Sequence, residues 1–299
     1  MTPAAVWSQG AAARRRLADY VALAKPRVVA MVVVTTTVGY YLGSVGVPAL
    51  RPLLQTLGAT ALAAAGTLAL NQWMERDLDA RMVRTRHRPL PDGRLLPGEA
   101  LAFGLALLVA GVALLALCAN ALAATLTAAI AVVYLLLYTP LKRRTSLCSV
   151  VGAVPGALPP VAGWAAARGV LGPEPWILFG IMFLWQIPHT LALGRVYRDD
   201  YARAGIPLLP VLERDGLRTG AHAVANCLAL LPVALLPTLI GLAGPCYFAV
   251  ALALGLGFLW SAVRLALRRS AAEARQLMLA SLIYLPVLLA AMALDKLPL

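Results

Sequence analysis

The chain has 299 residues, of which 61% are hydrophobic and only 13% are charged, and its formal net charge is +13. Soluble domains carry about 25% charged residues, and a soluble fold would have nowhere to hide so many long apolar runs. The composition therefore excludes an ordinary soluble protein. The basic residues lie in short segments between apolar runs, which indicates membrane topology and argues against a nucleic-acid partner. The four cysteines are scattered without metal-ligand spacing, so we expect neither a zinc site nor a disulfide framework.

Nine apolar segments approach the length of about 20 residues that a helix needs to cross a bilayer. We expect these spans at residues 28–45, 53–73, 99–118, 120–139, 147–166, 174–194, 219–241, 244–264 and 276–294. They predict an all-α, polytopic membrane protein of about nine transmembrane helices. Residues 1–27 lack the apolar core of a cleavable signal, so we expect a cytoplasmic N-terminal segment there and a single transmembrane domain at residues 28–299.

Local sequence features refine several spans. Only Ala119 and Asn120 separate the third span from the fourth, which predicts a tight helical hairpin. Glycine and proline punctuate the fifth span, so we expect a kink or an interruption whose freed backbone groups neighbouring helices satisfy. Close helix packing is expected at two GxxxG pairs, namely Gly39 with Gly43 and Gly152 with Gly156.

The distribution of basic residues predicts the orientation. Alternate loops and termini place 23 of the 26 basic residues on one side of the membrane and 3 on the other. The positive-inside rule then puts the N-terminus in the cytoplasm and the C-terminus outside, as expected for a protein of the bacterial cytoplasmic (inner) membrane. Two cytoplasmic loops, at residues 73–97 and 194–218, are longer than topology needs and hold most of the acidic residues.

The first polar cluster lies at the inner end of the second span. Asn71, Glu75 and Asp79 are spaced i, i+4 and i+8, so they share one stripe of a helix. Three oxygen-bearing side chains on one stripe suit Mg²⁺, which prefers oxygen ligands and often shares them with substrate phosphates. The alternative is a solvated helix end whose carboxylates are offset by Arg76 and Arg81.

An arginine-rich turn follows this stripe at residues 84–90. Arginine forks bind phosphate oxygens two at a time, so Arg84 and Arg88 are candidate diphosphate ligands. A metal stripe beside such a turn can divide the oxygens of a diphosphate between metal and guanidinium groups. Topology alone also accounts for some of these arginines.

A second polar cluster follows the sixth span at the same predicted face of the membrane. Asp199 and Asp200 are a second candidate pair of metal ligands, and a continuous helix would return Asp200 to nearly the face of His189. His189 lies within an apolar span, where a polar residue is a functional hypothesis. It can act as a base or contact a bound ligand, and Gln186 can share that role; the alternative is a hydrogen bond between helices.

The inner end of the fourth span carries Tyr138 and Lys142 on one face. The lysine can bind diphosphate, and the tyrosine ring can face a developing cation. The alternative is an interfacial tyrosine followed by a lysine that sets topology.

Together these motifs resemble the UbiA superfamily of intramembrane prenyltransferases, over nearly the whole chain. The matching segments are Lys25-Pro26-Arg27, Asn71 to Asp79, Arg84-Thr85 with Arg88-Pro89-Leu90, Tyr138 to Arg143, Gly156 to Pro160 with Gly163-Trp164, Trp185-Gln186 with Pro188-His189, and Asp200-Tyr201 with Gly205 and Leu209-Pro210. Taken by itself, the acidic stripe identifies only the superfamily and not a branch within it. The later segments point to the branch that modifies haem.

The resemblance implies a prenyltransferase helix bundle and a reaction in which farnesyl diphosphate, held by Mg²⁺, transfers its farnesyl group to a vinyl group of haem b. Haem b is then a substrate, the lipid bilayer surrounds the site, and a downstream haem A synthase is a candidate partner. The implied catalytic residues are Asn71, Glu75, Asp79, Asp200 and His189; the diphosphate ligands are Arg84, Arg88, Lys142 and Arg143; the contacts to acceptor or cation are Tyr138, Gln186 and Lys25; the metal ligands are Asn71, Glu75, Asp79, Asp199 and Asp200.

Two departures from the superfamily pattern and two rival functions stay open. Glu75 stands where aspartate is frequent, and Cys148 stands where asparagine is expected, so no role is carried to Cys148. The first rival is a prenyltransferase for a quinone precursor or another aromatic acceptor. The second is a transporter, whose polar residues should lie near the bilayer midplane; here the carboxylates gather at one face.

Overall fold

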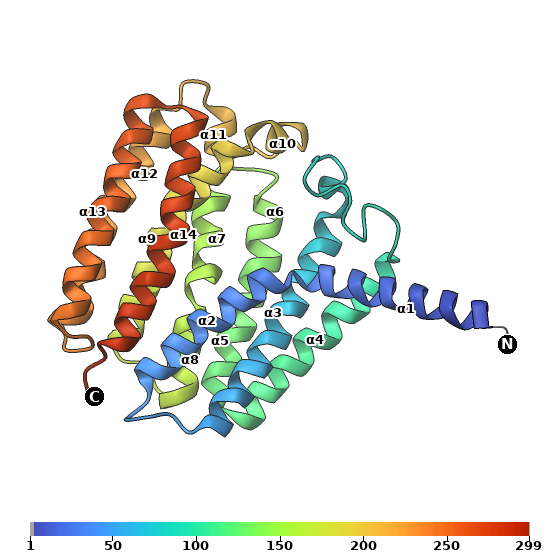
Figure 1. Ribbon diagram of the computed structural model, residues 1–299, viewed down its shortest axis with the longest axis horizontal. Coiled ribbons are helices and arrows are strands. Elements are labelled where there is room, and N and C mark those ends of the chain that lie inside the picture. The colour runs from blue at the N-terminus through green and yellow to red at the C-terminus, as the bar shows by residue number, and fades with distance from the viewer. Residues whose placement is uncertain (1–2, 299) are drawn as a thin grey trace.

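The computed structural model describes the backbone of residues 3–298 and the side chains of residues 14–298. This part of the chain is helical apart from its loops and one isolated antiparallel bridge between Ala243 and Lys296. The helices are α1 (Pro3–Ala24), α2 (Pro26–Gly43), α3 (Leu50–Asp79), α4 (Pro97–Cys118), α5 (Ala121–Val132), the π-helical η1 (Val133–Tyr138), α6 (Thr139–Leu141), α7 (Cys148–Ala157), α8 (Pro159–Arg168), α9 (Glu174–Val196), α10 (Arg198–Arg203), α11 (Leu209–Leu212), α12 (Leu217–Leu239), α13 (Pro245–Arg268) and α14 (Ala271–Leu294) (Figure 1).

The predicted membrane spans are present as helices. Eight helical segments of the described residues are long and apolar enough to cross a membrane, and α2 makes a ninth when it is joined to the last part of α1 across a 48° bend. Helices are the expected solution in lipid, because each satisfies its own backbone hydrogen bonds. The prediction of an all-α polytopic membrane protein with about nine spans is confirmed. The division into residues 1–27 and 28–299 stays a prediction.

The connection between α4 and α5 is the tight hairpin expected from the sequence. Asn120 caps α5 by accepting a hydrogen bond from the backbone N–H of Ala123 at 2.9 Å. Its amide nitrogen donates to the carbonyl oxygen of Ala165 at 2.8 Å, so the same side chain also ties the hairpin to α8. One asparagine thus caps the start of α5 and holds the hairpin against α8.

The fifth span is broken where its prolines predict a break. Helix α7 ends at Ala157 and α8 begins at Pro159, with Leu158 between them. Proline lacks an N–H to continue the ladder and clashes with the preceding turn. The two halves nevertheless follow one another as one membrane-crossing unit, Cys148–Arg168.

Small residues let the membrane helices pack closely, as the GxxxG spacing predicts. A side-chain carbon at Gly39 would collide with the carbonyl oxygen of Pro160, and one at Gly163 would collide with that of Thr36. The backbones of α2 and α8 are therefore in direct contact. Helix association in lipid relies on such packing, because lipid supplies no hydrophobic drive between helices. Gly43 likewise gives room to the ring of Trp164.

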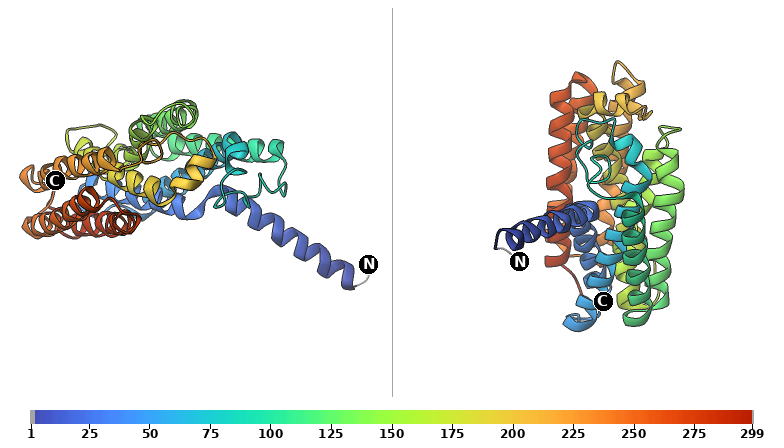
Figure 2. Two further views of the ribbon diagram at one scale, coloured as in Figure 1. Left: turned by 90° about the horizontal axis from the view of Figure 1, so that it is seen from above. Right: turned by 90° about the vertical axis from the view of Figure 1, so that its right-hand side faces the viewer.

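Two features of the arrangement position the polar residues. The C-terminal ends of α3 and α9, the loop of residues 80–96 and helix α10 all gather at one end of the bundle (Figure 1). Helix α1 instead leaves the body of the bundle sideways (Figure 2). Its last turn is held to α3 by Gln72, whose amide donates to the carbonyl oxygen of Leu23 at 2.6 Å.

Candidate active site

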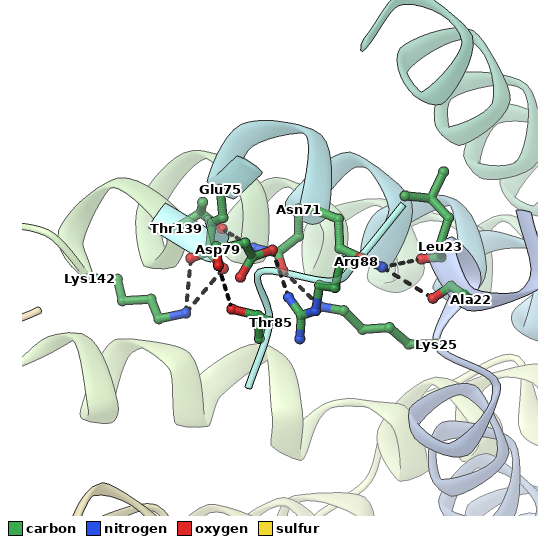
Figure 3. Close-up of polar contacts among 11 residues, drawn as sticks. Ala22, Leu23, Lys25, Asn71, Glu75, Asp79, Thr85, Arg88, Thr139 and Lys142 are labelled. Carbon is green, nitrogen blue, oxygen red and sulfur yellow. Dashed lines mark hydrogen bonds and ion pairs between the residues drawn. The ribbon is translucent and has the colours of Figure 1, made fainter. Parts of the chain in front are cut away.

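The last two turns of α3 carry the predicted stripe on one buried face. Asn71, Glu75 and Asp79 are only 2%, 4% and 1% exposed, and their side chains point to the same side of the helix (Figure 3). Two carboxylates buried at such depth need compensating partners, because an isolated buried charge is costly. The stripe is therefore no solvated helix end.

Each member of the stripe has a basic partner from another part of the chain (Figure 3). Lys142 reaches both carboxylate oxygens of Glu75 at 3.0 Å. Arg88 donates to Oδ2 of Asp79 at 2.7 Å, and Lys25 donates to Oδ1 of Asn71 at 3.2 Å. Three of the predicted ligands for diphosphate or substrate, far apart in sequence, thus meet at one stripe.

The backbone of Lys25 is strained in a way that serves this arrangement. Lys25 has φ 51° and ψ 64°, the left-handed region, and it precedes Pro26. A non-glycine residue in this region is uncommon, and such strain costs on the order of 1–3 kcal/mol. The strained residue forms the bend between α1 and α2, and its ammonium group ends on Asn71.

The loop after α3 folds back on the stripe. Thr85 is 1% exposed and donates its hydroxyl to the carbonyl oxygen of Asp79 at 2.9 Å. Arg84 does not join Arg88; its guanidinium lies 4.9 Å from the ring centre of Tyr197 and 5.9 Å from that of Tyr201. The two predicted phosphate-binding arginines therefore face different elements, one the stripe and one the residues after α9.

The second acidic cluster reaches the first through this loop. Asp200 is buried and accepts a hydrogen bond at 3.2 Å from the backbone N–H of Val83, and it pairs with Arg203. Burial raises the pKa of the Asp200 carboxyl, but the hydrogen bonds from Arg203 and from the backbone N–H groups of Val83 and Arg84 outweigh it and hold the pKa below its usual value. Asp199 is exposed.

The chain after the sixth span is not one continuous helix. Helix α9 ends at Val196, and α10 begins at Arg198, with Tyr197 in a non-helical conformation between them. The condition under which Asp200 would return to the face of His189, a continuous helix, is therefore not met. The break turns α10 toward the loop of residues 80–96, which is how Asp200 reaches Val83.

The remaining predicted residues are Tyr138 on η1, Arg143 after α6 and Gln186 on α9. The ring of Tyr138 is 5.1 Å from that of Tyr134 and fills the space left by Gly152, where a side-chain carbon would lie 2.6 Å from the ring. Arg143 is exposed. Gln186 joins α9 to α7, since its amide donates to the carbonyl oxygen of Ala153 at 2.8 Å.

An apolar cavity of about 480 Å³ opens in the bundle beside the stripe. It lies within the range of about 300–1,000 Å³ typical of small-molecule sites. Thr67, one helical turn before Asn71 on α3, lines it, as do Tyr134, Trp185 and His189. The cavity therefore continues the face of α3 that carries the stripe, so a polar group and an apolar tail can be held by adjacent sites.

The donor set of the stripe suits a shared magnesium ion. Among the described side chains, no group of three or more His, Cys, Asp and Glu residues is arranged to hold a metal ion. Glu75, Asp79 and Asn71 offer two carboxylates and one amide oxygen, all buried. Mg²⁺ is usually bound by one or two carboxylates together with substrate phosphates. The chemistry of these residues fits Mg²⁺ that arrives with a diphosphate.

Three polar residues of the site were missed in the sequence. Thr139 accepts from the amide of Asn71 at 3.1 Å, Thr85 holds the end of α3, and Ser281 lies 2.7 Å from Nδ1 of His189. Thr85 and Thr139 stand inside motifs already noted, so their place in the sequence could have indicated a role in the site. A threonine hydroxyl by itself did not. Ser281 stands in the apolar ninth span, where serine is common in helix contacts.

Comparisons with known proteins place this arrangement. The protein family described as the UbiA prenyltransferase family matches this chain over residues 32–285. A protoheme IX farnesyltransferase from Solibacter usitatus is 47% identical over 288 residues, covering 93% of this chain and 98% of the relative. A solved structure described as digeranylgeranylglyceryl phosphate synthase is 17% identical, with a TM-score of 0.77 over 94% of this chain and 98% of that one. A UbiA homologue from Archaeoglobus fulgidus, solved with GPP and Mg²⁺, is 17% identical, with a TM-score of 0.65 over 92% and 99%.

The fold and the site define an intramembrane enzyme with a buried acidic stripe, paired with basic side chains, one helical turn along α3 from an apolar cavity. The chain belongs to the UbiA prenyltransferase family. The family resemblance found in its motifs is thereby confirmed.

Proposed function

We propose that this protein transfers the farnesyl group of farnesyl diphosphate to a vinyl group of haem b, giving haem O. The observation that carries the proposal is the buried, cation-paired stripe on α3, which begins one helical turn after Thr67 in the wall of an apolar cavity. A prenyl diphosphate has this same division into a polar head and a greasy tail. The choice of haem as acceptor follows the relative from Solibacter usitatus, a protoheme IX farnesyltransferase.

The stripe and its basic partners would hold the diphosphate. Mg²⁺ would be held by Asn71, Glu75 and Asp79, with Asp200 as a further carboxylate ligand, and it supplies charge neutralisation for the leaving diphosphate. A diphosphate offers Lys142 and Arg88 new oxygen partners while the ion offers the carboxylates a cation. Charges therefore stay paired when these partners are exchanged. Preorganised cations at the leaving group lower the barrier, because charge builds there as the bond breaks.

The cavity would hold the farnesyl chain and the acceptor. The bond between farnesyl carbon 1 and the diphosphate oxygen breaks, and the terminal carbon of the haem vinyl group bonds to that carbon. The positive charge moves to the vinyl carbon next to the porphyrin ring, where water adds and loses a proton. The products are haem O, diphosphate and a proton. Apolar walls would exclude other water from the allylic cation. The tyrosine ring that lines the cavity is that of Tyr134, against which Tyr138 packs, so a cation–π contact of Tyr138 would act next to this ring.

The same residues suggest how the protein sits in the membrane. The distribution of basic residues puts the N-terminus and the end of the bundle with the stripe in the cytoplasm, and the C-terminus outside. In that orientation a soluble diphosphate is released to the cytoplasm while the greasy product stays in the bilayer. A downstream haem A synthase is the partner that would take it.

The product identifies the acceptor. Purified protein in nanodiscs would be given farnesyl diphosphate, Mg²⁺ and an equimolar mixture of haem b and an aromatic quinone precursor, followed by mass spectrometry. We expect the haem mass to rise by one farnesyl group plus one hydroxyl group. A prenylated aromatic product with unchanged haem would assign the protein to quinone biosynthesis instead.

A further inference from the structure

His189 is held in one orientation by a short hydrogen-bonded chain between α9 and α14. Its Nδ1 lies 2.7 Å from the hydroxyl oxygen of Ser281, and that hydroxyl donates to the carbonyl oxygen of Met278 at 2.6 Å. The indole of Trp185, one turn away, stacks on the imidazole with ring centres 5.3 Å apart and an angle of 16° between the planes. The indole N–H in turn donates to the carbonyl oxygen of Ser281 at 2.9 Å.

This series of hydrogen bonds assigns the tautomer of the His189 imidazole. The serine hydroxyl has a single hydrogen, and the carbonyl oxygen of Met278 has none, so the hydrogen must lie between those two oxygens. The 2.7 Å contact then requires Nδ1 of His189 to be the donor. Nε2 consequently carries the free lone pair of a neutral ring, and no hydrogen bond to it occurs within the described part of the chain.

The cavity that His189 lines has the chemistry of a haem site. Its walls are largely apolar. Among the described lining residues, the only lysine or arginine is Arg27, and its positive charge suits an acidic propionate of haem. Thr36, also in the lining, is 1% exposed and its hydroxyl has no partner. A histidine that ligates a metal through Nε2 donates its other N–H to a fixed acceptor, and Ser281 is that acceptor here.

We propose that Nε2 of His189 ligates the iron of the haem substrate and that Ser281 is the positioning residue that orients it. This inference rests on the proposed function, because it takes haem as the acceptor. The nitrogen donates its lone pair to the iron and displaces a water ligand, with no change in oxidation state. Iron ligation would fix the porphyrin in the cavity, so that one vinyl group faces the farnesyl carbon.

The chain offers matched controls because it has three histidines. His87 and His222 are exposed and do not line the cavity. The test uses the full chain in nanodiscs, as wild type and as the variants His189→Ala, His222→Ala and Ser281→Ala. Ferric haem b is titrated, followed by absorbance and electron paramagnetic resonance, with ¹⁵N-histidine in the wild type. Iron-free protoporphyrin IX is titrated in parallel.

We expect ¹⁵N coupling to the iron in the wild type and an imidazole-type spectrum that His222→Ala retains. His189→Ala should lose that spectrum, regain it with free imidazole, and bind iron-free porphyrin as the wild type does. Ser281→Ala should weaken haem binding by roughly 10–100-fold, the usual effect of removing the partner of a ligating histidine, with less change for iron-free porphyrin.

The contrary outcomes separate the two proposals. Farnesylated haem as product, together with identical spectra for wild type and His189→Ala, would overturn iron ligation and leave the function standing. No binding of either porphyrin and no farnesylated haem would overturn both. If His189→Ala does not fold, the ¹⁵N coupling of the wild type and the Ser281→Ala titration decide, and absence of both effects refutes the ligation.

Discussion

Arg88 and Asp79 form an ion pair of 2.7 Å in which the carboxylate is 1% exposed and the guanidinium 28% exposed. The pair bends the loop after α3 back over the last turn of that helix. Breaking one partner of such a pair leaves the other charge buried without compensation. The same contact therefore stabilises the site and, in the proposed function, affects the affinity for diphosphate.

The two aspartates at the end of α3 give a matched test of the stripe. We predict that Asp79→Asn lowers farnesyl transfer by about 100-fold or more, since it removes a carboxylate from a site whose charge stabilisation is worth several kcal/mol. Asp77→Asn, on a side chain that is 72% exposed, should leave the rate unchanged. Initial rates of product formation at saturating Mg²⁺ measure both. Equal loss in the two variants would remove the special role of the stripe.

The ion pair itself can be separated from catalysis by a double-mutant cycle. Arg88→Ala should lower the free energy of unfolding by about 1–3 kcal/mol, because Asp79 then lacks its donor. Adding Asp79→Ala should recover much of that loss while the enzyme stays inactive. Thermal unfolding in detergent and product assays on the same samples would check this, and strictly additive destabilisation would argue against the pair.

Lys142 should act on binding of the prenyl donor. Loss of a charge-assisted contact costs about 1.5–3 kcal/mol, so we predict that Lys142→Met raises the KM for farnesyl diphosphate by about 10–100-fold. Arg144→Met, at an exposed neighbouring position, serves as control and should keep the wild-type KM. Steady-state kinetics with haem b in excess make the comparison. An unchanged kcat/KM would place Lys142 outside the diphosphate site.

Close packing of α2 on α8 can be tested without touching the polar site. Gly39→Val places its Cβ atom where the carbonyl oxygen of Pro160 stands, and we predict a loss of about 1–3 kcal/mol from overpacking. Gly257→Val on α13 meets nothing within 4 Å and should be tolerated. Thermal unfolding of the two variants provides the measurement. Equal stability would mean that α2 and α8 can separate without cost.

Hydropathy and the charge pattern were sufficient to predict the nine spans, because a membrane helix satisfies its own backbone and needs only length and apolarity. The spacing of Asn71, Glu75 and Asp79 likewise predicted a stripe, since helical periodicity is local. The break at Tyr197 was not predicted, because nothing in the local composition there signals that tertiary contacts stop the helix.

Pairings between residues far apart in the sequence could not be predicted either, because tertiary contacts leave no local pattern. The contacts of Lys142 with Glu75 and of Val83 with Asp200 depend on how the helices pack, and no periodicity reports that. Ser281 illustrates the limit most clearly. A serine in an apolar span has no motif around it, and its role beside His189 emerges only when α9 and α14 lie together.

The most direct test of the account is equilibrium binding of labelled farnesyl diphosphate to the purified protein, with Mg²⁺ or with EDTA. We predict binding that requires Mg²⁺ and that both Asp79→Asn and Asp200→Asn weaken, while Asp77→Asn binds normally. Full affinity in EDTA, or full affinity in both the Asp79 and Asp200 variants, would contradict a metal-bridged diphosphate at this end of the bundle.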